Sequence, residues 1–324
     1  MSIYDKLAKN EKCVKLVRNT RKKKNEIEKK RRIRGKYKFI DRKNDSDKLC
    51  IILAGYKEFL YDDVFGRIKK YIPSDIDVCI VSSGLYSEKL NEIASNNNWS
   101  YLSVKQNKVT LAQNIAINLF ENAKLIFKLD EDIFVTKNFF TELLKTYEKV
   151  TKEGKYRVGF VAPLIPINGY AHIRVLEKTE LLSTYEKKFG RAQHNWSPDG
   201  KVVTNPDVAK FMWGETEKKL RDIDKLDSQF AKEPFSYSVS AIRFSIGAIL
   251  FSRDLWETMG RFVVGPGNNM GRDETQICDF VMADSRAIIV SENTIVGHFS
   301  FGKQTAAMKK YYEKNRDIFK LKEK

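Results

Sequence analysis

The 324-residue chain lacks the features that mark secreted, membrane-spanning or low-complexity proteins. Its four cysteines include no C-x-x-C pair, and Cys50 and Cys79 lie inside apolar runs, so we interpret them as reduced core residues of an intracellular protein. No run of 18 apolar residues is present, and the N-terminus lacks the apolar core of a secretory signal. We therefore expect a cytoplasmic protein without a membrane-spanning helix.

Acidic residues are scarce at the N-terminus, and the positive charge is concentrated there. Residues 1–44 contain eighteen Lys and Arg but five Asp and Glu, which gives +13 of the total charge of +17. Ile3, Leu7, Val14 and Val17 follow helical spacing in this segment. The pattern favours a basic helix bound at an anionic surface, such as the inner face of a membrane. A nucleic-acid-binding arm is less favoured because stacking aromatics are few, and a solvated charged helix is the third interpretation.

Strand-like and helix-like segments alternate after this basic region. Apolar runs predict strands at residues 49–54, 76–81 and 99–104, and helical spacing predicts helices at 61–71, 87–94 and 110–122. This alternation is typical of an α/β fold with a mostly parallel central sheet flanked by helices. We expect a basic helical extension over 1–45, an α/β domain over 46–304 with an irregular insertion at 151–240, and a basic C-terminal helix at 305–324.

The most informative segment is the acidic cluster of Asp130, Glu131 and Asp132, which lies between two strongly apolar flanks. Carboxylates at the end of a buried strand need compensation, because an unpaired buried charge is very costly. Oxygen ligands of this kind suit Mg²⁺ or Mn²⁺, which in proteins commonly also hold substrate phosphates. An acidic turn without a metal is the simpler alternative.

Two other predicted strand ends should meet this cluster. Ala54 ends the first predicted strand, Gly55 and Tyr56 follow it, and Ser83 follows the second strand. Ligands of parallel α/β sheets collect beyond the carboxyl ends of the strands, so the three loops should form one site.

Four segments in this order make the chain resemble the nucleotide-sugar glycosyltransferases of the GT-A fold, in particular the inverting family two. Asn107 and the pair Gln113-Asn114 stand before the acidic strand, and Asp130-Glu131-Asp132 matches the D-x-D motif. The stretch from Phe244 to Phe262 is similar to the part of that family that shapes the donor and acceptor floor. Gly271-Arg272-Asp273-Glu274 stands at the family's acidic-pair position, and the resemblance covers roughly residues 48–300.

The resemblance implies transfer of a sugar from a nucleoside diphosphate, most readily a UDP-sugar, to a hydroxyl group. It implies Glu274, with Asp273 as its alternative, as the base, and Asp130, Asp132 and His298 around Mn²⁺ or Mg²⁺. Donor contacts are then expected from Ala54, Gly55, Tyr56, Ser83, Asn107, Asn114, Asp130 and Glu131. The acceptor would be a glycan, a lipid-linked sugar or a cell-surface polymer.

The chain departs from the family pattern at three places. The acidic loop that contacts the base in many members is replaced by Ser82-Ser83-Gly84, which puts uridine recognition in doubt. The acidic pair is Asp-Glu rather than Glu-Asp. The insertion at 151–240 is long, and its aromatic residues are more typical of a core than of a sugar platform, although Trp196 and Trp213 are acceptor candidates together with Glu215.

Four other functions remain open from the sequence. A phosphatase with a D-x-D nucleophile would need Thr or Val where Phe134 stands, and its motif would normally lie in the first strand. A basic nucleic-acid-binding protein is less consistent with the charge distribution, because the basic charge is confined to the N-terminal segment and the rest of the chain is nearly neutral. A glycosyltransferase acting on modified nucleic acid, or one that retains anomeric configuration, is compatible with the residues.

Overall fold

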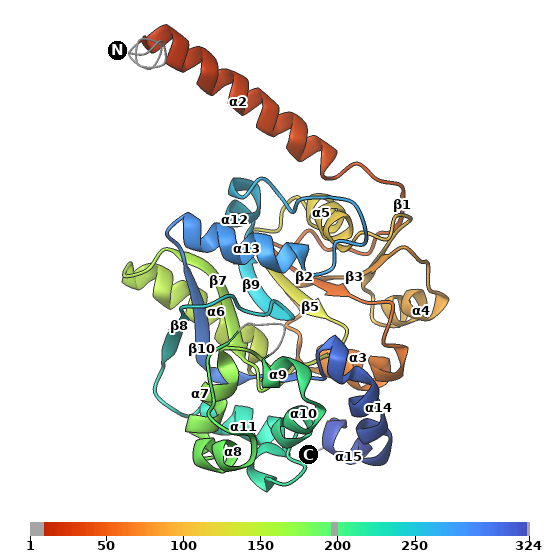
Figure 1. Ribbon diagram of the computed structural model, residues 1–324. Helices are drawn as coiled ribbons and strands as arrows, with labels where there is room; N and C mark the ends of the chain where they lie inside the picture. The colour runs from red at the N-terminus through yellow and green to blue at the C-terminus, as the bar shows by residue number, and fades with distance from the viewer. Residues whose placement is uncertain (1–9, 196–199, 323–324) are drawn as a thin grey trace.

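The computed structural model describes residues 10–195 and 200–322. A nine-stranded sheet runs through the body in the order β1-β4-β3-β2-β5-β9-β7-β10-β8, with helices on both faces (Figure 1). The strands are β1 (Tyr37–Ile40), β2 (Lys48–Leu53), β3 (Asp77–Ser83), β4 (Ser100–Val104), β5 (Leu125–Asp130), β7 (Val158–Leu164), β8 (Tyr237–Ser240), β9 (Ala248–Ser252) and β10 (Ala287–Ile295).

Six of these strands run in one direction, and β1, β8 and β9 run against them. The predicted α/β class with a mostly parallel central sheet is confirmed. The chain builds β2, β3 and β4 outward on one side and then returns to place β5 on the other side of β2. This reversal creates a switch point between β2 and β5, where open α/β sheets commonly bind ligands.

Short helices and one small sheet complete the fold. The helices of the first half are α2 (Glu11–Arg31), η1 (Glu58–Leu60), α3 (Tyr61–Tyr71), α4 (Glu88–Asn96), α5 (Val109–Leu119) and α6 (Phe139–Glu153). Those of the second half are α7 (Ala171–Lys178), α8 (Leu182–Phe189), α9 (Lys201–Thr204), α10 (Pro206–Met212), η2 (Lys218–Leu220), α11 (Ile223–Phe230), α12 (Arg253–Thr258), α13 (Arg272–Ala283), η3 (Gly302–Gln304), α14 (Thr305–Lys314) and α15 (Arg316–Phe319). The strands β6 (Ile133–Phe134) and β11 (Gly297–His298) pair outside the main sheet.

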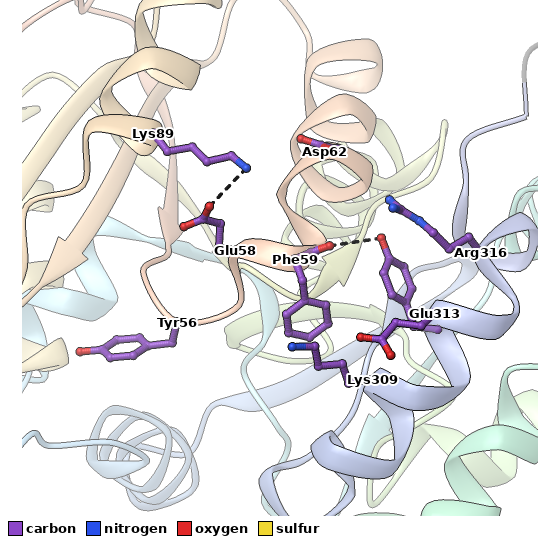
Figure 2. A pocket seen from close by; sticks show the side chains of 9 residues that line it. Tyr56, Glu58, Phe59, Asp62, Lys89, Lys309, Glu313 and Arg316 are labelled. Atoms are coloured by element: carbon purple, nitrogen blue, oxygen red, sulfur yellow. Dashed lines mark hydrogen bonds and ion pairs between the residues drawn. The ribbon is translucent and has the colours of Figure 1, made fainter.

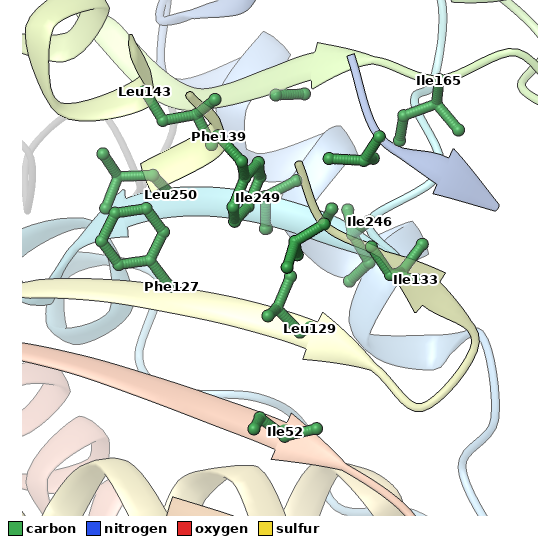
Figure 3. Close-up of a cluster of buried hydrophobic side chains, with 14 of the residues drawn as sticks. Ile52, Phe127, Leu129, Ile133, Phe139, Leu143, Ile165, Ile246, Ile249 and Leu250 are labelled. Carbon is green, nitrogen blue, oxygen red and sulfur yellow. The ribbon is translucent and has the colours of Figure 1, made fainter. Parts of the chain in front are cut away.

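The core lies where β5 and β9 pack against α6. Phe127 of β5 contacts Phe139 and Phe140 at ring-centroid distances of 6.0 and 5.1 Å, and all three side chains are buried (Figure 3). Residues at alternate positions of a strand point to opposite faces, so Lys128 and Asp130 point away from this cluster. The rigid apolar layer therefore supports a polar strand end.

Two predicted boundaries are wrong. Residues 37–40 were expected in the helical extension, but they form β1, which pairs antiparallel with β4. The predicted insertion at 151–240 contains β7, a strand inside the sheet, and β8 at its edge. Its irregular part is therefore limited to the segment between these strands, which holds α7 to α11. Tertiary pairing decided the first case, because residues 37–40 have no strong local pattern, whereas the continuous apolar run of β7 is a local strand signal.

The basic helix α2 projects away from the body (Figure 1). None of its residues is buried, and its last turn carries Lys29, Lys30 and Arg31. Among the described residues, every helix is too short or too polar to cross a membrane.

A buried arginine links three distant parts of the chain. Arg67 of α3 is 1% exposed and donates two hydrogen bonds, of 2.8 and 2.9 Å, to the carboxylate of Asp224 in α11. Its guanidinium also donates to the backbone carbonyl groups of Val135, Phe319 and Lys320. A guanidinium suits this role because its donors are fixed in one plane.

We expect Arg67→Leu to lower the free energy of unfolding by about 3 kcal/mol, since the change leaves Asp224 and three carbonyl groups without their donor. Urea denaturation measures this loss. Lys69→Leu, at an exposed position of the same helix, is the matched control and should stay within about 0.5 kcal/mol of wild type. Equal stability of the two variants would contradict the linking role of Arg67.

Candidate functional site

The loops after β2 and β5 meet at the switch point and are joined by Glu131. Its carboxylate accepts hydrogen bonds from the backbone N–H groups of Gly55 (2.7 Å) and Tyr56 (3.0 Å). The backbone N–H of Ala54 is also used, by the carbonyl oxygen of Val81. Glu131 therefore fixes the β2 loop, and its predicted donor contact stays a prediction.

The small sheet of β6 and β11 brings His298 beside Asp132. Pairing of His298 with Ile133 places the histidine next to the end of the acidic cluster, and the N–H of Phe299 donates to the carbonyl oxygen of Asp132 at 3.0 Å. His298 Nε2 lies 3.6 Å from Asp132 Oδ2. The two residues, 166 positions apart, thus face each other with both side chains almost fully buried.

The ring of His298 is oriented by the backbone. His298 Nδ1 lies 3.0 Å from the carbonyl oxygen of Ile167, which is an acceptor, so Nδ1 carries the proton and donates. Nε2 is then available to bind a cation, and metal-binding histidines commonly have this second hydrogen bond. The part of the chain that the structure describes holds no group of three or more His, Cys, Asp or Glu side chains able to bind an ion by themselves. Asp132 and His298 therefore fit a divalent ion whose other ligands are substrate oxygens and water.

Lys57 is the cation that contacts Asp132 in this structure. Its ammonium group forms a short ion pair with Asp132 Oδ2. Burial acts to raise the pKa of the Asp132 carboxyl, but the interactions with Lys57 and His298 together outweigh it and hold the pKa well below its usual range. Asp132 is therefore ionised under all ordinary conditions.

Lys128 is a buried cation that lies near the other carboxylates, Asp130, Asp273 and Glu274. Lys128 Nζ donates to Asp130 Oδ1 at 2.6 Å and to the carbonyl oxygen of Ile246 at 2.9 Å. Burial acts to lower the pKa of Lys128, but the charges of Asp130, Asp273 and Glu274 raise it. Asp130, predicted to contact the metal and the donor, is the partner of a lysine in this structure, with 38% of its side chain exposed.

The acidic pair lies in the first turn of α13, near this lysine. Asp273 is buried and accepts a hydrogen bond of 2.7 Å from Gln113 Nε2. Glu274 forms an ion pair with Arg243 at 2.8 Å. Burial raises the pKa of Glu274 to about 7, although Arg243 acts in the opposite direction. A carboxyl that titrates near neutral pH is suited to proton transfer.

Asn114 is a structural residue, so its predicted donor contact is wrong. Its amide group donates to the carbonyl oxygens of Arg32 and Phe262, and its oxygen accepts from Trp256 Nε1 and the N–H of Phe262. All its side-chain groups are used inside the protein, where it is fully buried. It connects α5 to the segment after α12.

Tyr56, Ser83 and Asn107 form one edge of the site. The hydroxyl of Tyr56 lies 3.0 Å from the carbonyl oxygen of Ser83 and 3.1 Å from Asn107 Oδ1, and these two acceptors share its single hydrogen. The ring itself is 60% exposed. Gly84 has a positive φ of 82°, and a Cβ there would lie 2.4 Å from the Asn107 Cβ, so the close approach of these loops requires glycine. The structure thus brings three predicted donor residues together.

Of the predicted acceptor residues within the described part of the chain, Trp213 is buried and Glu215 is exposed. Trp213 is 2% exposed, packs against Phe134 and Phe319, and donates through Nε1 to the carbonyl oxygen of His298. Its acceptor role is wrong because its faces are covered. Glu215 is exposed after α10, near Tyr311 of α14. Trp196 lies outside the described residues.

A pocket of about 650 Å³ lies beside the β2 loop (Figure 2). Tyr56 forms one edge, and the other lining residues come from η1, α3, α4, α14 and α15. Lys89 points toward Glu58, with a distance of 3.4 Å between the charged groups. Lys309 lies over the ring of Phe59 at 5.0 Å. Since its acidic and basic residues are mixed, the pocket does not favour a ligand of one charge.

Four residues of the site were not predicted from the sequence. Lys128 had a readable signal, because a lysine inside an apolar strand, two positions before Asp130, must share a face with it. Lys57 follows a predicted strand-end loop, but nothing local indicated its partner. Gln113 and Arg243 contact Asp273 and Glu274 across gaps of 160 and 31 residues, which only folding can close.

No family model and no curated protein matches the chain. Solved structures with a similar fold include the mannosyltransferase PcManGT from Pyrobaculum calidifontis in complex with GDP-Man and Mn²⁺, with 13% identity and a TM-score of 0.44 over 83% of this chain and 62% of that one. GalNAc-T7 with UDP, GalNAc and Mn²⁺ is similar at 11% identity and a TM-score of 0.43, over 81% of this chain and 45% of that one. The chain thus spans less than two thirds of either protein.

The raised pKa of Glu274 makes stability depend on pH. The folded protein holds the proton more tightly than the unfolded chain, in which the pKa is about 4.5, so stability falls as the pH rises from 4.5 to 7. Glu274→Gln has no titrating carboxyl at this position, so it does not undergo this loss of stability. We expect its free energy of unfolding, relative to wild type, to rise by about 2–3 kcal/mol across that window and then level off.

Urea denaturation between pH 4 and pH 8 measures the difference. Glu88→Gln, in the exposed first turn of α4, is the matched control for loss of one carboxyl. A difference between wild type and Glu274→Gln that is constant from pH 4 to pH 8 would show that Glu274 titrates normally.

Proposed function

We propose that this chain is a metal-dependent glycosyltransferase that moves a sugar from a nucleoside-diphosphate sugar to a hydroxyl group of a glycan or lipid-linked acceptor. The observation that carries the proposal is the pairing of Asp132 with His298 at the switch point between β2 and β5. A buried carboxylate and an oriented imidazole at that place suit a divalent ion whose remaining ligands are diphosphate oxygens and water. Glu274 supplies a carboxyl suited to proton transfer beside the same strand end.

The donor binds across the three loops at the carboxyl ends of β2, β3 and β5. Asp132 and His298 hold Mn²⁺ or Mg²⁺, which when bound stabilises the negative charge of the departing diphosphate. The exposed ring of Tyr56 is placed for stacking on the nucleobase, with its hydroxyl already held by Ser83 and Asn107. A UDP-sugar is the proposed donor.

Glu274 is the proposed base for an inverting transfer. It removes the proton of the acceptor hydroxyl as that oxygen attacks the sugar from the face opposite the diphosphate. Arg243 holds the carboxylate in place, and Asp273, fixed by Gln113, adds the negative charge that favours proton uptake. Activity should therefore increase as the pH rises through about 7.

Calorimetry with UDP and with GDP, each in Mn²⁺ and in a chelator, tests the proposal. We expect binding that depends on Mn²⁺, and we expect Asp132→Asn to weaken Mn²⁺-dependent binding at least about tenfold, because the main anionic ligand is lost. Binding of equal strength in chelator would contradict the proposal.

Glu274→Gln is the control in the same experiment. This variant should bind nucleotide and Mn²⁺ as wild type does, while release of the nucleoside diphosphate from a panel of nucleotide sugars with glycan acceptors falls by about 10²–10⁴-fold. Near-normal turnover would reject its role as base.

We further propose that α2 holds the enzyme at an anionic membrane surface, where lipid-linked acceptors lie. The helix has ten Lys and Arg against three Glu and no buried residue, and Leu16, Val17 and Ile27 are exposed on it. Basic charge with a few apolar side chains supports interfacial binding that weakens with salt.

Flotation with vesicles that contain phosphatidylserine tests this placement. We expect the full chain to float at low salt and to be released at high salt, and a chain without residues 1–28, which keeps Arg32 and β1, to stay at the bottom. Vesicles of neutral lipid are the control. Flotation of the shortened chain equal to that of the full chain would refute the role of α2.

A further inference from the structure

Lys57 occupies an unusual place for a lysine in a site that suits a divalent ion. Its ammonium group contacts the Asp132 carboxylate, which is 4% exposed, while 24% of the lysine side chain reaches solvent. Within residues 10–195 and 200–322, Asp132 is its hydrogen-bond and ion-pair partner. An ammonium group has three donors, so two remain for other acceptors in the site.

The backbone of Lys57 is fixed, but its side chain is long and flexible. The preceding Gly55 and Tyr56 are held by Glu131, and the following η1 begins at Glu58. The ammonium can therefore leave Asp132 without any change of the loop. An anionic ligand near the strand ends would offer the ammonium group a new partner.

We propose that Lys57 is an internal counter-cation that competes with the divalent ion for Asp132 until a nucleoside diphosphate arrives. Two cations at one carboxylate repel each other, so the ion binds weakly while Lys57 has no other partner. A diphosphate offers oxygen atoms to the ammonium and adds negative charge beside both cations. The ion and the nucleotide then bind cooperatively, and each increases the affinity of the other by the same factor.

This inference rests on the proposed function and adds to it that the ion and the nucleotide bind together. An ion alone would not occupy the site to a large extent, and a nucleotide alone would meet Lys57 without the ion. The arrangement protects Asp132 from being a buried charge without a partner, which would be costly in the unloaded protein.

Titration of Mn²⁺, followed by the electron paramagnetic resonance signal of the free ion, tests the proposal in the full chain. Lys57→Met should bind Mn²⁺ alone about tenfold more tightly than wild type, because the competing charge is gone. UDP or GDP should increase the Mn²⁺ affinity of wild type about tenfold or more, and should increase that of Lys57→Met much less. Lys57→Arg keeps the charge and should retain the enhancement.

Lys89→Met is the matched control, since Lys89 is paired with Glu58 in the neighbouring pocket and does not contact Asp132. It should behave as wild type in both titrations. Mn²⁺ affinity of Lys57→Met equal to or weaker than that of wild type, or an unchanged enhancement by nucleotide, would overturn the inference. Wild type that binds no Mn²⁺ even with UDP and GDP would instead overturn the proposed function, so the two failures are distinguishable.

Discussion

Asp132 is a carboxylate that the fold buries almost completely at the end of β5, and much of the surrounding structure exists to compensate its charge. Lys57 neutralises it from the β2 loop, and His298 faces it from β11. The small sheet of β6 and β11, the carboxylate of Glu131 and the carbonyl oxygen of Ile167 hold these partners in place. The cost of an unpaired buried charge explains why so many backbone groups are used at this one point.

A second balance of charge lies on the other side of the same strand end. Lys128 contacts Asp130 and is near Asp273 and Glu274, so one buried cation faces three carboxyl groups. Arg243 adds a further cation to Glu274. The pKa of Glu274 still reaches about 7, because burial outweighs both. Carboxyl groups of nearly the same chemistry are thus separated into a permanently ionised Asp132 and a titrating Glu274, which is the division that metal binding and proton transfer require.

The sequence contained enough information for the α/β class and for the residues at the strand ends, because apolar runs and helical spacing are local patterns. It identified Asp130, Asp132, Asp273 and Glu274, whose positions after a buried strand or at a helix start have direct physical consequences. It gave the wrong role to Asn114 and Trp213, whose polar groups are all used inside the protein. A polar or aromatic residue near a site is equally suited to bind a ligand or to satisfy the protein, and only the number of its internal partners distinguishes these uses.

The amino-acid sequence by itself determined the alternation of strands and helices, the acidic cluster after a buried strand and the concentration of basic charge in the first 44 residues. Only the tertiary structure decided that β1 joins the sheet, that β7 lies inside it and that Lys57 and Arg243 become the partners of Asp132 and Glu274. The reason is physical. Periodicity and local charge act between neighbours along the chain, whereas a buried ion pair depends on contacts between residues that are far apart in sequence.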